Sequence, residues 1–279
     1  MREAAEPAWL LGEVGRRMAE RLSWIRTQPD QALVWWPELG GGEQALRSQY
    51  PNITLHTQAT PGASLPTAQP WWRSLARPFK PRGSQPFDMQ QSSPMGLVWA
   101  NMMLHWADAD LPTLLATWHR ALATEGFLMF SAFGPDTVRS LNAVHEAMGW
   151  GPAGPAFIDM HDLGDQLVHT GFADPVMDME MITLSWPDLP ALLRELRCLG
   201  GNTAAQRFIG LRTPRWQQRW QAALEQQLRG PDGRLSLRFE IIYGHAFKPL
   251  PRPAVKAETT VSLDDMRSLV RRGPTGNPR

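Results

Sequence analysis

Apolar residues in the first part of the chain recur with two different spacings. Over 13–26 they share one face of a helix, with charged residues on the other face, so this stretch is predicted to be a surface helix. The unbroken apolar run 32–36 and the shorter run 53–56 are typical of strands, and 43–49 between them has the composition of a helix. The first sixty residues therefore predict a βαβ unit preceded by a helix.

The alternation continues to about residue 250. Expected strands are 96–100, 127–130 and 176–184, and expected helices are 111–122, 134–147, 162–170 and 216–228. From Leu235 to Tyr243 apolar residues alternate with polar ones, the pattern of a half-buried strand that lies near a sheet edge. We predict an α/β, Rossmann-like fold, a mainly parallel sheet with helices on both faces and an antiparallel strand near one edge.

Two segments break this pattern. Residues 57–94 are rich in proline, serine, glutamine and glycine, and we expect an irregular insertion with one short helix around 71–76. Residues 251–279 combine prolines and charges with few apolar residues, which predicts a flexible tail with a short helix at 263–270. We therefore expect one domain over 1–250 and a tail over 251–279.

Composition narrows the class of protein. The 279 residues include 28 basic and 27 acidic ones, a balance that argues against a strongly basic nucleic-acid binder. No apolar run has the length of a membrane span or of a signal peptide. The single cysteine, Cys198, excludes an internal disulfide. We expect a cytoplasmic monomer with no nucleic-acid or membrane partner.

A run of three glycines, Gly40, Gly41 and Gly42, follows the first predicted strand. A glycine turn at this place lets a nucleotide approach the backbone, although a flexible loop without a ligand fits this bare run equally well. Such folds usually hold a ribose with a carboxylate after the second strand. Between Gln44 and Phe87 the sequence has no Asp or Glu.

Eight short motifs together resemble one family. They are EVGRRM (13–18), IRTQP (25–29), LVWAN (97–101), HW (105–106), FSAFGPDT (130–137), FIDMHDLGD (157–165), GFADPVMDME (171–180) and YGHAFKP (243–249). With these motifs the chain resembles the malonyl-acyl-carrier-protein O-methyltransferases of biotin synthesis (the BioC family), which are class I methyltransferases that use S-adenosylmethionine. The resemblance extends from about residue 10 to 250.

This resemblance implies transfer of a methyl group from S-adenosylmethionine to the free carboxylate of a malonyl thioester on an acyl carrier protein. A carboxylate is already ionised, so no catalytic acid or base is expected. The cofactor-binding candidates are Glu38, Gly40, Gly41, Gly42, Asp88 and Asn101. The substrate-binding candidates are Arg139, Arg194, Arg197 and Tyr243, and each of the three arginines also fits a solvated surface residue.

An acidic carrier protein is the implied partner. The basic residues that could dock it are Arg73, Arg77, Lys80 and Arg82, which fit a solvated loop equally well.

The chain departs from the family at the cofactor motif. Where the family has an acid followed by Gly-x-Gly-x-Gly, this chain has Val34 and then Trp36–Gly40, so only the last glycine matches. The position of the ribose-binding acid falls at Gln58 or Ala59. Two hypotheses follow: an active methyltransferase whose loop is rebuilt around Glu38, or a non-catalytic relative retained for partner binding.

Two other groups of residues have a structural interpretation. His161, Asp162 and Asp165 lie within one helical turn, which favours helix capping over a metal site. Trp216 and Trp220 share a helical face, which favours core packing over ligand binding.

Overall fold

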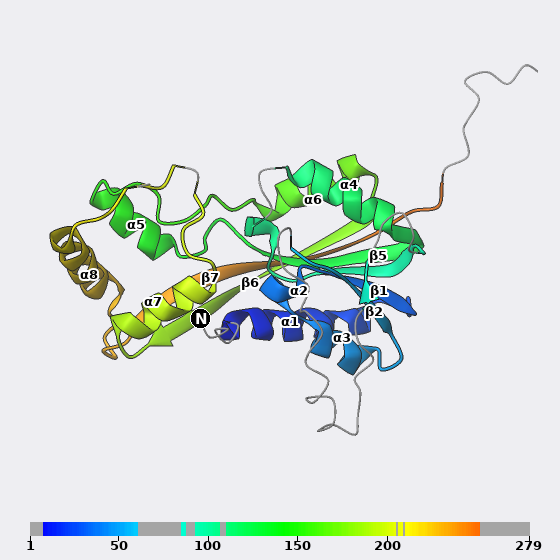
Figure 1. Ribbon diagram of the computed structural model, residues 1–279, viewed down its shortest axis with the longest axis horizontal. Coiled ribbons are helices and arrows are strands. Elements are labelled where there is room, and N and C mark those ends of the chain that lie inside the picture. The colour runs from blue at the N-terminus through cyan, green and yellow to red at the C-terminus, as the bar shows by residue number, and fades with distance from the viewer. Residues whose placement is uncertain are drawn as a thin grey trace, which may run out of the picture. The chain divides into compact units, whose positions relative to one another are not determined.

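The computed structural model describes residues 8–60, 85–87, 93–106, 110–204, 206–208 and 210–251 (Figure 1). Contacts within the chain divide it into two units, Met1–Pro249 and Leu250–Arg279. All helices and strands below belong to the first unit. The helix expected around 71–76, the basic residues of that segment and the tail after 251 lie outside the described residues.

A seven-stranded sheet forms the centre of the first unit, in the order β3-β2-β1-β4-β5-β7-β6. The strands are β1 (Gln31–Trp35), β2 (Thr54–Gln58), β3 (Gln85–Pro86), β4 (Met95–Ala100), β5 (Leu122–Phe133), β6 (Ala173–Trp186) and β7 (Leu235–Phe247). Strands β1 to β5 pair in parallel, and β7 is antiparallel to both β5 and β6. The predicted mainly parallel sheet with an antiparallel strand near one edge is confirmed.

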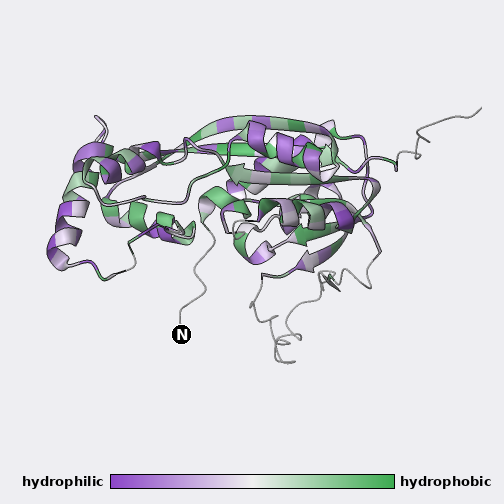
Figure 2. Cartoon of the chain, turned by 90° about the horizontal axis from the view of Figure 1, so that it is seen from above, coloured by the Kyte–Doolittle hydropathy of each residue, from purple (hydrophilic) through white to green (hydrophobic). Residues whose placement is uncertain are grey.

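Helices cover both faces of this sheet (Figure 1). They are α1 (Trp9–Arg21), α2 (Pro37–Gly40), α3 (Glu43–Gln49), α4 (Leu111–Ala121), α5 (Arg139–Ala147), α6 (Met160–Thr170), α7 (Leu189–Cys198) and α8 (Pro214–Leu228), with 3₁₀ turns η1 (Leu22–Trp24) and η3 (Leu104–Trp106). The core on one face unites buried residues of α1, α3, α5, α7 and α8, and the core on the other unites those of α4 and α6. Apolar and polar residues alternate along these helices (Figure 2), as expected for helices with one face on the sheet.

The buried part of β7 is longer than its sequence pattern predicts. Leu235 and Leu237 are buried and Arg238 is exposed, as expected for a half-buried strand. Further along, Ile242 packs in the core of α4 and α6, and Tyr243 packs in the core of α1. Because β5 and β6 flank β7 and helices cover both of its faces, this end of β7 is enclosed on all sides.

Helix α7 is an element that the sequence analysis did not predict. Asp188 caps it by accepting a 2.8 Å hydrogen bond from the amide of Ala191, and a proline lies in its first turn. Leu192 and Leu193 are buried against the core. The capping aspartate and the proline are sequence signals of a helix start. They come soon after a long strand, with no glycine between to mark the end of that strand, so the helix was not predicted.

The order of the strands determines where a ligand can bind. Strand β1 lies between β2 and β4, and Val34 pairs with Thr57 on one side and Trp99 on the other. The strand order changes direction between β1 and β4, since β2 and β3 follow toward one edge and β5 toward the other. Ligands of such sheets bind outside the carboxyl ends of the strands at this point. In the described part of the chain, no helix is long and apolar enough to cross a membrane.

Candidate functional site

The predicted cofactor loop lies at the carboxyl end of β1. Trp36 has left-handed backbone (φ 49°), and its amide donates a 2.8 Å hydrogen bond to the carbonyl of Gln58, which joins the ends of β1 and β2. A proline in the first turn then starts α2, since its fixed φ suits a helix start. Gly41 and Gly42 follow with φ of 63° and 104°. The glycine turn thus comes one helical turn after the strand, and not directly after it.

Asn101, at the end of β4, holds this loop in place. Its side chain is buried, and its amide donates to the carbonyls of Leu11 (2.9 Å) and Gly40 (2.5 Å). Its Oδ1 accepts a 2.8 Å hydrogen bond from the Ser131 hydroxyl. A Cβ added at Gly40 would lie 1.7 Å from the Asn101 carbonyl oxygen, so only glycine allows this approach. Asn101 was predicted to bind the cofactor. The hydrogen bonds of its side chain go to other parts of the protein, so it positions the loop.

The outer side of the loop is open. A Cβ added at Gly41 would meet no atom within 4 Å, whereas one at Gly42 would lie 2.2 Å from Trp99 Nε1. Glu38 is exposed and makes no hydrogen bond or ion pair with any described residue. An accessible backbone beside a free carboxylate suits a nucleoside ligand with ribose hydroxyls.

The end of β2 offers an amide at the position where the resemblance implies an acid. Gln58 is the last residue of β2, and its Nε2 donates a 3.3 Å hydrogen bond to the carbonyl of Ala59. A neutral amide is a weaker acceptor for hydroxyl groups than a carboxylate. Glu38 is an exposed carboxylate on the loop between β1 and α3. Asp88 lies outside the described residues.

A cavity of about 280 Å³ opens beyond the carboxyl end of β5. Most of its walls are apolar, and η3 contributes His105 four residues after Asn101. The lining residues are His105, Phe133, Thr137, Val138, Leu141, His145, Ala153, Gly154, Pro155, Phe157, Leu193, Leu196, Arg197, Leu199, Gly201, Asn202, Trp216, Trp220 and Phe239. Asn101, which holds the loop, and His105, which lines the cavity, thus belong to the same segment after β4.

The two histidines in its wall are neutral at pH 7. Burial lowers the pKa of His105 to about 4, and its ring packs on Phe133 with 5.1 Å between centroids. Burial also lowers the pKa of His145, whose Nδ1 donates to the Gly151 carbonyl while its Nε2 accepts from the Trp220 indole. Among the described residues that line the cavity, Arg197 is the only one with a permanent charge.

The structure separates the four substrate-binding candidates. Arg197 is exposed on α7 and contributes to the cavity wall, and Arg194 lies one turn earlier, on a groove between α7 and α8. Arg139 begins α5, with a side chain that is 79% exposed and pairs with Asp136 at 3.2 Å. Of the three arginines, only Arg197 lies at the cavity.

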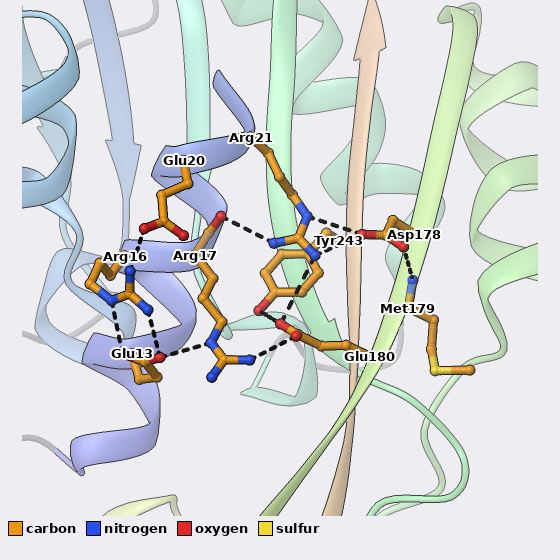
Figure 3. Close-up of polar contacts among 9 residues, drawn as sticks. All are labelled: Glu13, Arg16, Arg17, Glu20, Arg21, Asp178, Met179, Glu180 and Tyr243. Carbon is orange, nitrogen blue, oxygen red and sulfur yellow. Dashed lines mark hydrogen bonds and ion pairs between the residues drawn. The ribbon is translucent and has the colours of Figure 1, made fainter. Parts of the chain in front are cut away.

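Tyr243 belongs to a cluster of charged residues between α1 and the strands β6 and β7 (Figure 3). Its hydroxyl donates a 2.5 Å hydrogen bond to Glu180, which also pairs with Arg17 at 2.7 Å. The Arg21 guanidinium lies 3.7 Å from the centre of its ring and pairs with Asp178 at 2.7 Å. Burial and the neighbouring Glu180 raise the pKa of Tyr243. These contacts give Tyr243 a structural role in holding α1 on the sheet.

The two structural interpretations from the sequence have different outcomes. The start of α6 is capped, but by Asp159, whose carboxylate accepts a 2.7 Å hydrogen bond from the amide of His161. The described residues hold no group of three or more metal-ligating side chains. Trp216 and Trp220 stack 5.8 Å apart and line the cavity, so core packing is only part of their role.

Sequence reasoning missed the cavity because its walls come from separate parts of the chain. Phe133 ends β5, Phe157 lies before α6, and Leu193 belongs to α7, the helix that was not predicted. None of these residue types signals a pocket by itself. The HW motif at 105–106 was the available signal.

Comparison with known proteins finds relatives that share one name. A protein of Gallionella capsiferriformans is 37% identical over 254 residues, covering 88% of this chain and 86% of its own length. One of Laribacter hongkongensis is 35% identical over 272 residues, covering 94% and 89%. Both are named malonyl-(acyl-carrier protein) O-methyltransferase. No family model matches the chain.

Solved structures agree on the fold. The YcgJ protein of Bacillus subtilis has a TM-score of 0.53 at 8% identity, covering 86% of this chain and all of that one. A Bacillus halodurans protein solved as a candidate methyltransferase has a TM-score of 0.52 at 12% identity, covering 84% and 99%. These likenesses concern the fold alone, and the sequence relatives carry the assignment. The chain belongs to the malonyl-(acyl-carrier protein) O-methyltransferase family.

Proposed function

We propose that this chain transfers a methyl group from S-adenosylmethionine to the free carboxylate of a malonyl thioester carried by an acyl carrier protein. One observation carries the proposal: Asn101, which holds the cofactor loop, and His105, which lines the cavity, lie four residues apart on the segment that follows β4. A donor bound on the loop and an acceptor bound in the cavity are then neighbours. The names of the relatives supply the identity of the acceptor.

The loop holds the cofactor. Gly41 offers open backbone, Glu38 offers a carboxylate for ribose hydroxyls, and Asn101 acts by positioning the loop. When bound, S-adenosylmethionine supplies the methyl group: its C–S bond breaks as a C–O bond to the carboxylate forms, leaving a thioether and a methyl ester. No proton is transferred, so the reaction needs no general base.

The cavity binds the acceptor. Its aromatic and aliphatic walls remove water from the carboxylate, which makes that oxygen a better nucleophile. Arg197 supplies the cation that orients the carboxylate, because His105 and His145 are neutral at pH 7. Arg197 is thus the substrate-binding residue of this proposal.

The partner is an acyl carrier protein, as in the names of the relatives. The compartment that we propose is the cytoplasm. Its support is the single free cysteine, Cys198, which is exposed, since reducing compartments keep such thiols unpaired.

A non-catalytic relative that retains the fold for partner binding is the second candidate. The observation that favours it is the neutral Gln58 at the end of β2, where the family has an acid. In that case the cavity and its arginine would bind an acyl group without methyl transfer.

An intact-mass assay separates the two candidates. Malonyl-acyl carrier protein is incubated with the full chain and S-adenosylmethionine, and its mass is followed with time. The proposed function predicts a gain of one methyl group, which is lost together with the acyl group when the thioester is cleaved. An unchanged mass at saturating cofactor would support the non-catalytic candidate.

A further inference from the structure

We propose that the α7–α8 surface docks the acyl carrier protein, an inference that rests on the function proposed above. We define this surface as Arg194 of α7, Arg215 and Arg219 of α8, and Phe208 and Leu211 of the segment between the two helices. The three arginines and both apolar residues are exposed. The surface lies at one end of the first unit, beside α5 (Figure 1).

Charge is the first argument. Residues 189–229 contain seven arginines and two glutamates, whereas the whole chain carries a net charge of only +1. Arg229 pairs with Glu225, but Arg194, Arg215 and Arg219 have no acidic partner among the described residues. Unpaired arginines gathered on two neighbouring helices attract an acidic partner and steer its approach.

Exposed apolar side chains are the second argument. Leu211 is 99% exposed and Phe208 is 53% exposed. The Arg212 guanidinium lies 3.7 Å from the centre of the Phe208 ring and 4.4 Å from that of Trp216. A supported aromatic ring and a leucine beside several arginines have the composition of a protein interface.

Continuity with the cavity is the third argument. The groove between α7 and α8 is lined by Arg194, Gln218, Gln221 and other residues, and it shares Leu193 and Arg197 with the cavity. A carrier protein held on the α7–α8 surface can therefore direct its thioester arm past Arg197. The proposed acceptor cation would then lie at the entrance that the arm uses.

A second copy of this chain fits the surface less well. A two-fold contact would bring the same arginines of both copies together, and like charges across an interface oppose binding. An acidic carrier protein meets the arginines with opposite charge.

Charge reversal tests the proposal. The dissociation constant of fluorescently labelled malonyl-acyl carrier protein is measured by anisotropy for the full-length chain, for Arg194→Glu/Arg215→Glu and for the control Arg26→Glu/Arg120→Glu. The control makes the same change in net charge at exposed arginines outside the α7–α8 surface. Circular dichroism melting checks that each variant is folded.

We expect the Arg194→Glu/Arg215→Glu variant to bind at least about ten-fold more weakly at low salt, and the difference to shrink as salt rises. Leu211→Ser should weaken binding several-fold with little dependence on salt, since it removes an apolar contact. The control should bind as the wild type does.

Several results would overturn the proposal. One is an equal loss of binding in the control variant, and another is no measurable binding of the carrier protein by the wild type. A third is that these residues bind RNA or a second copy of the chain and not the carrier protein.

Methylation of malonyl-coenzyme A by the wild type is measured separately. If it occurs while the α7–α8 variants bind normally, the proposed function stands and the docking site is wrong. If it fails while those variants lose binding, the docking site stands without the activity.

Discussion

Arg197 is the residue on which acceptor binding depends, because the other ionisable side chains of the cavity wall are neutral at pH 7. Replacing it with alanine should raise the KM for malonyl-coenzyme A roughly ten- to a hundred-fold, the effect of one charge-assisted hydrogen bond. Arg197→Lys should recover part of the loss because it keeps the charge. Steady-state kinetics with Arg120→Ala as the control checks this, and an unchanged KM in Arg197→Ala would exclude the assigned role.

His105 should make stability depend on pH. Its pKa is about 4 in the folded chain and near 6.5 when unfolded, so below pH 6.5 the unfolded chain takes up the proton first. This costs about 2 kcal/mol of stability between pH 7 and pH 5. Urea unfolding at both pH values should show a smaller pH dependence in His105→Gln. An equal pH dependence in both proteins would mean that His105 titrates normally when folded.

At the residue scale, two of the candidates named from the sequence, Arg197 and Asn101, lie at the cavity or the loop. The arginine that reaches the cavity, Arg197, was among the predicted candidates, but nothing in the sequence distinguished it from Arg194, three residues earlier. Their separation depends on how α7 packs against α8. Asn101 was also predicted at the site, yet its buried bonds to Leu11 and Ser131 join distant parts of the chain that sequence spacing does not connect.

The elements α1 and β6 are joined by the charged cluster around Tyr243. Tyr243→Phe removes the hydroxyl that donates to Glu180, and we expect a loss of about 1–3 kcal/mol in the free energy of unfolding. Arg139→Ala, which removes an exposed ion pair, should have little effect. Urea unfolding measures both. A stable Tyr243→Phe protein with impaired methylation would instead assign Tyr243 to substrate binding.

Elements with a clear local pattern of apolar residues or composition could be predicted. Elements whose bounds depend on contacts with distant parts of the chain could not. The helix at 43–49 and the strand that starts at Leu235 were predicted with correct starts, because alternation and composition act locally. Helix α2 was not predicted, since a proline directly after a buried strand indicates a break and not a helical turn. The extension of β7 to Phe247 depends on its pairing with β5 and β6.

At the scale of the whole molecule, the family and the fold agree, and we propose that the cofactor loop is rebuilt. The one-turn helix α2 separates the glycine turn from the end of β1, and Gln58 ends β2 where the resemblance implies an acid. A carboxylate clamp for the ribose can then come from Glu38. Because this clamp differs from that of relatives with an intact motif, we expect S-adenosylmethionine to bind at least about ten-fold more weakly than to such a relative.

A calorimetric titration of the full-length chain with S-adenosylmethionine, and with its demethylated product, tests the rebuilt site most directly. We predict saturable binding of both ligands to the wild type, weaker than to a relative with an intact motif, and loss of that binding in Glu38→Ala. Absence of binding to the wild type, or binding of ordinary methyltransferase strength that Glu38→Ala leaves unchanged, would contradict a cofactor site built around α2 and Glu38.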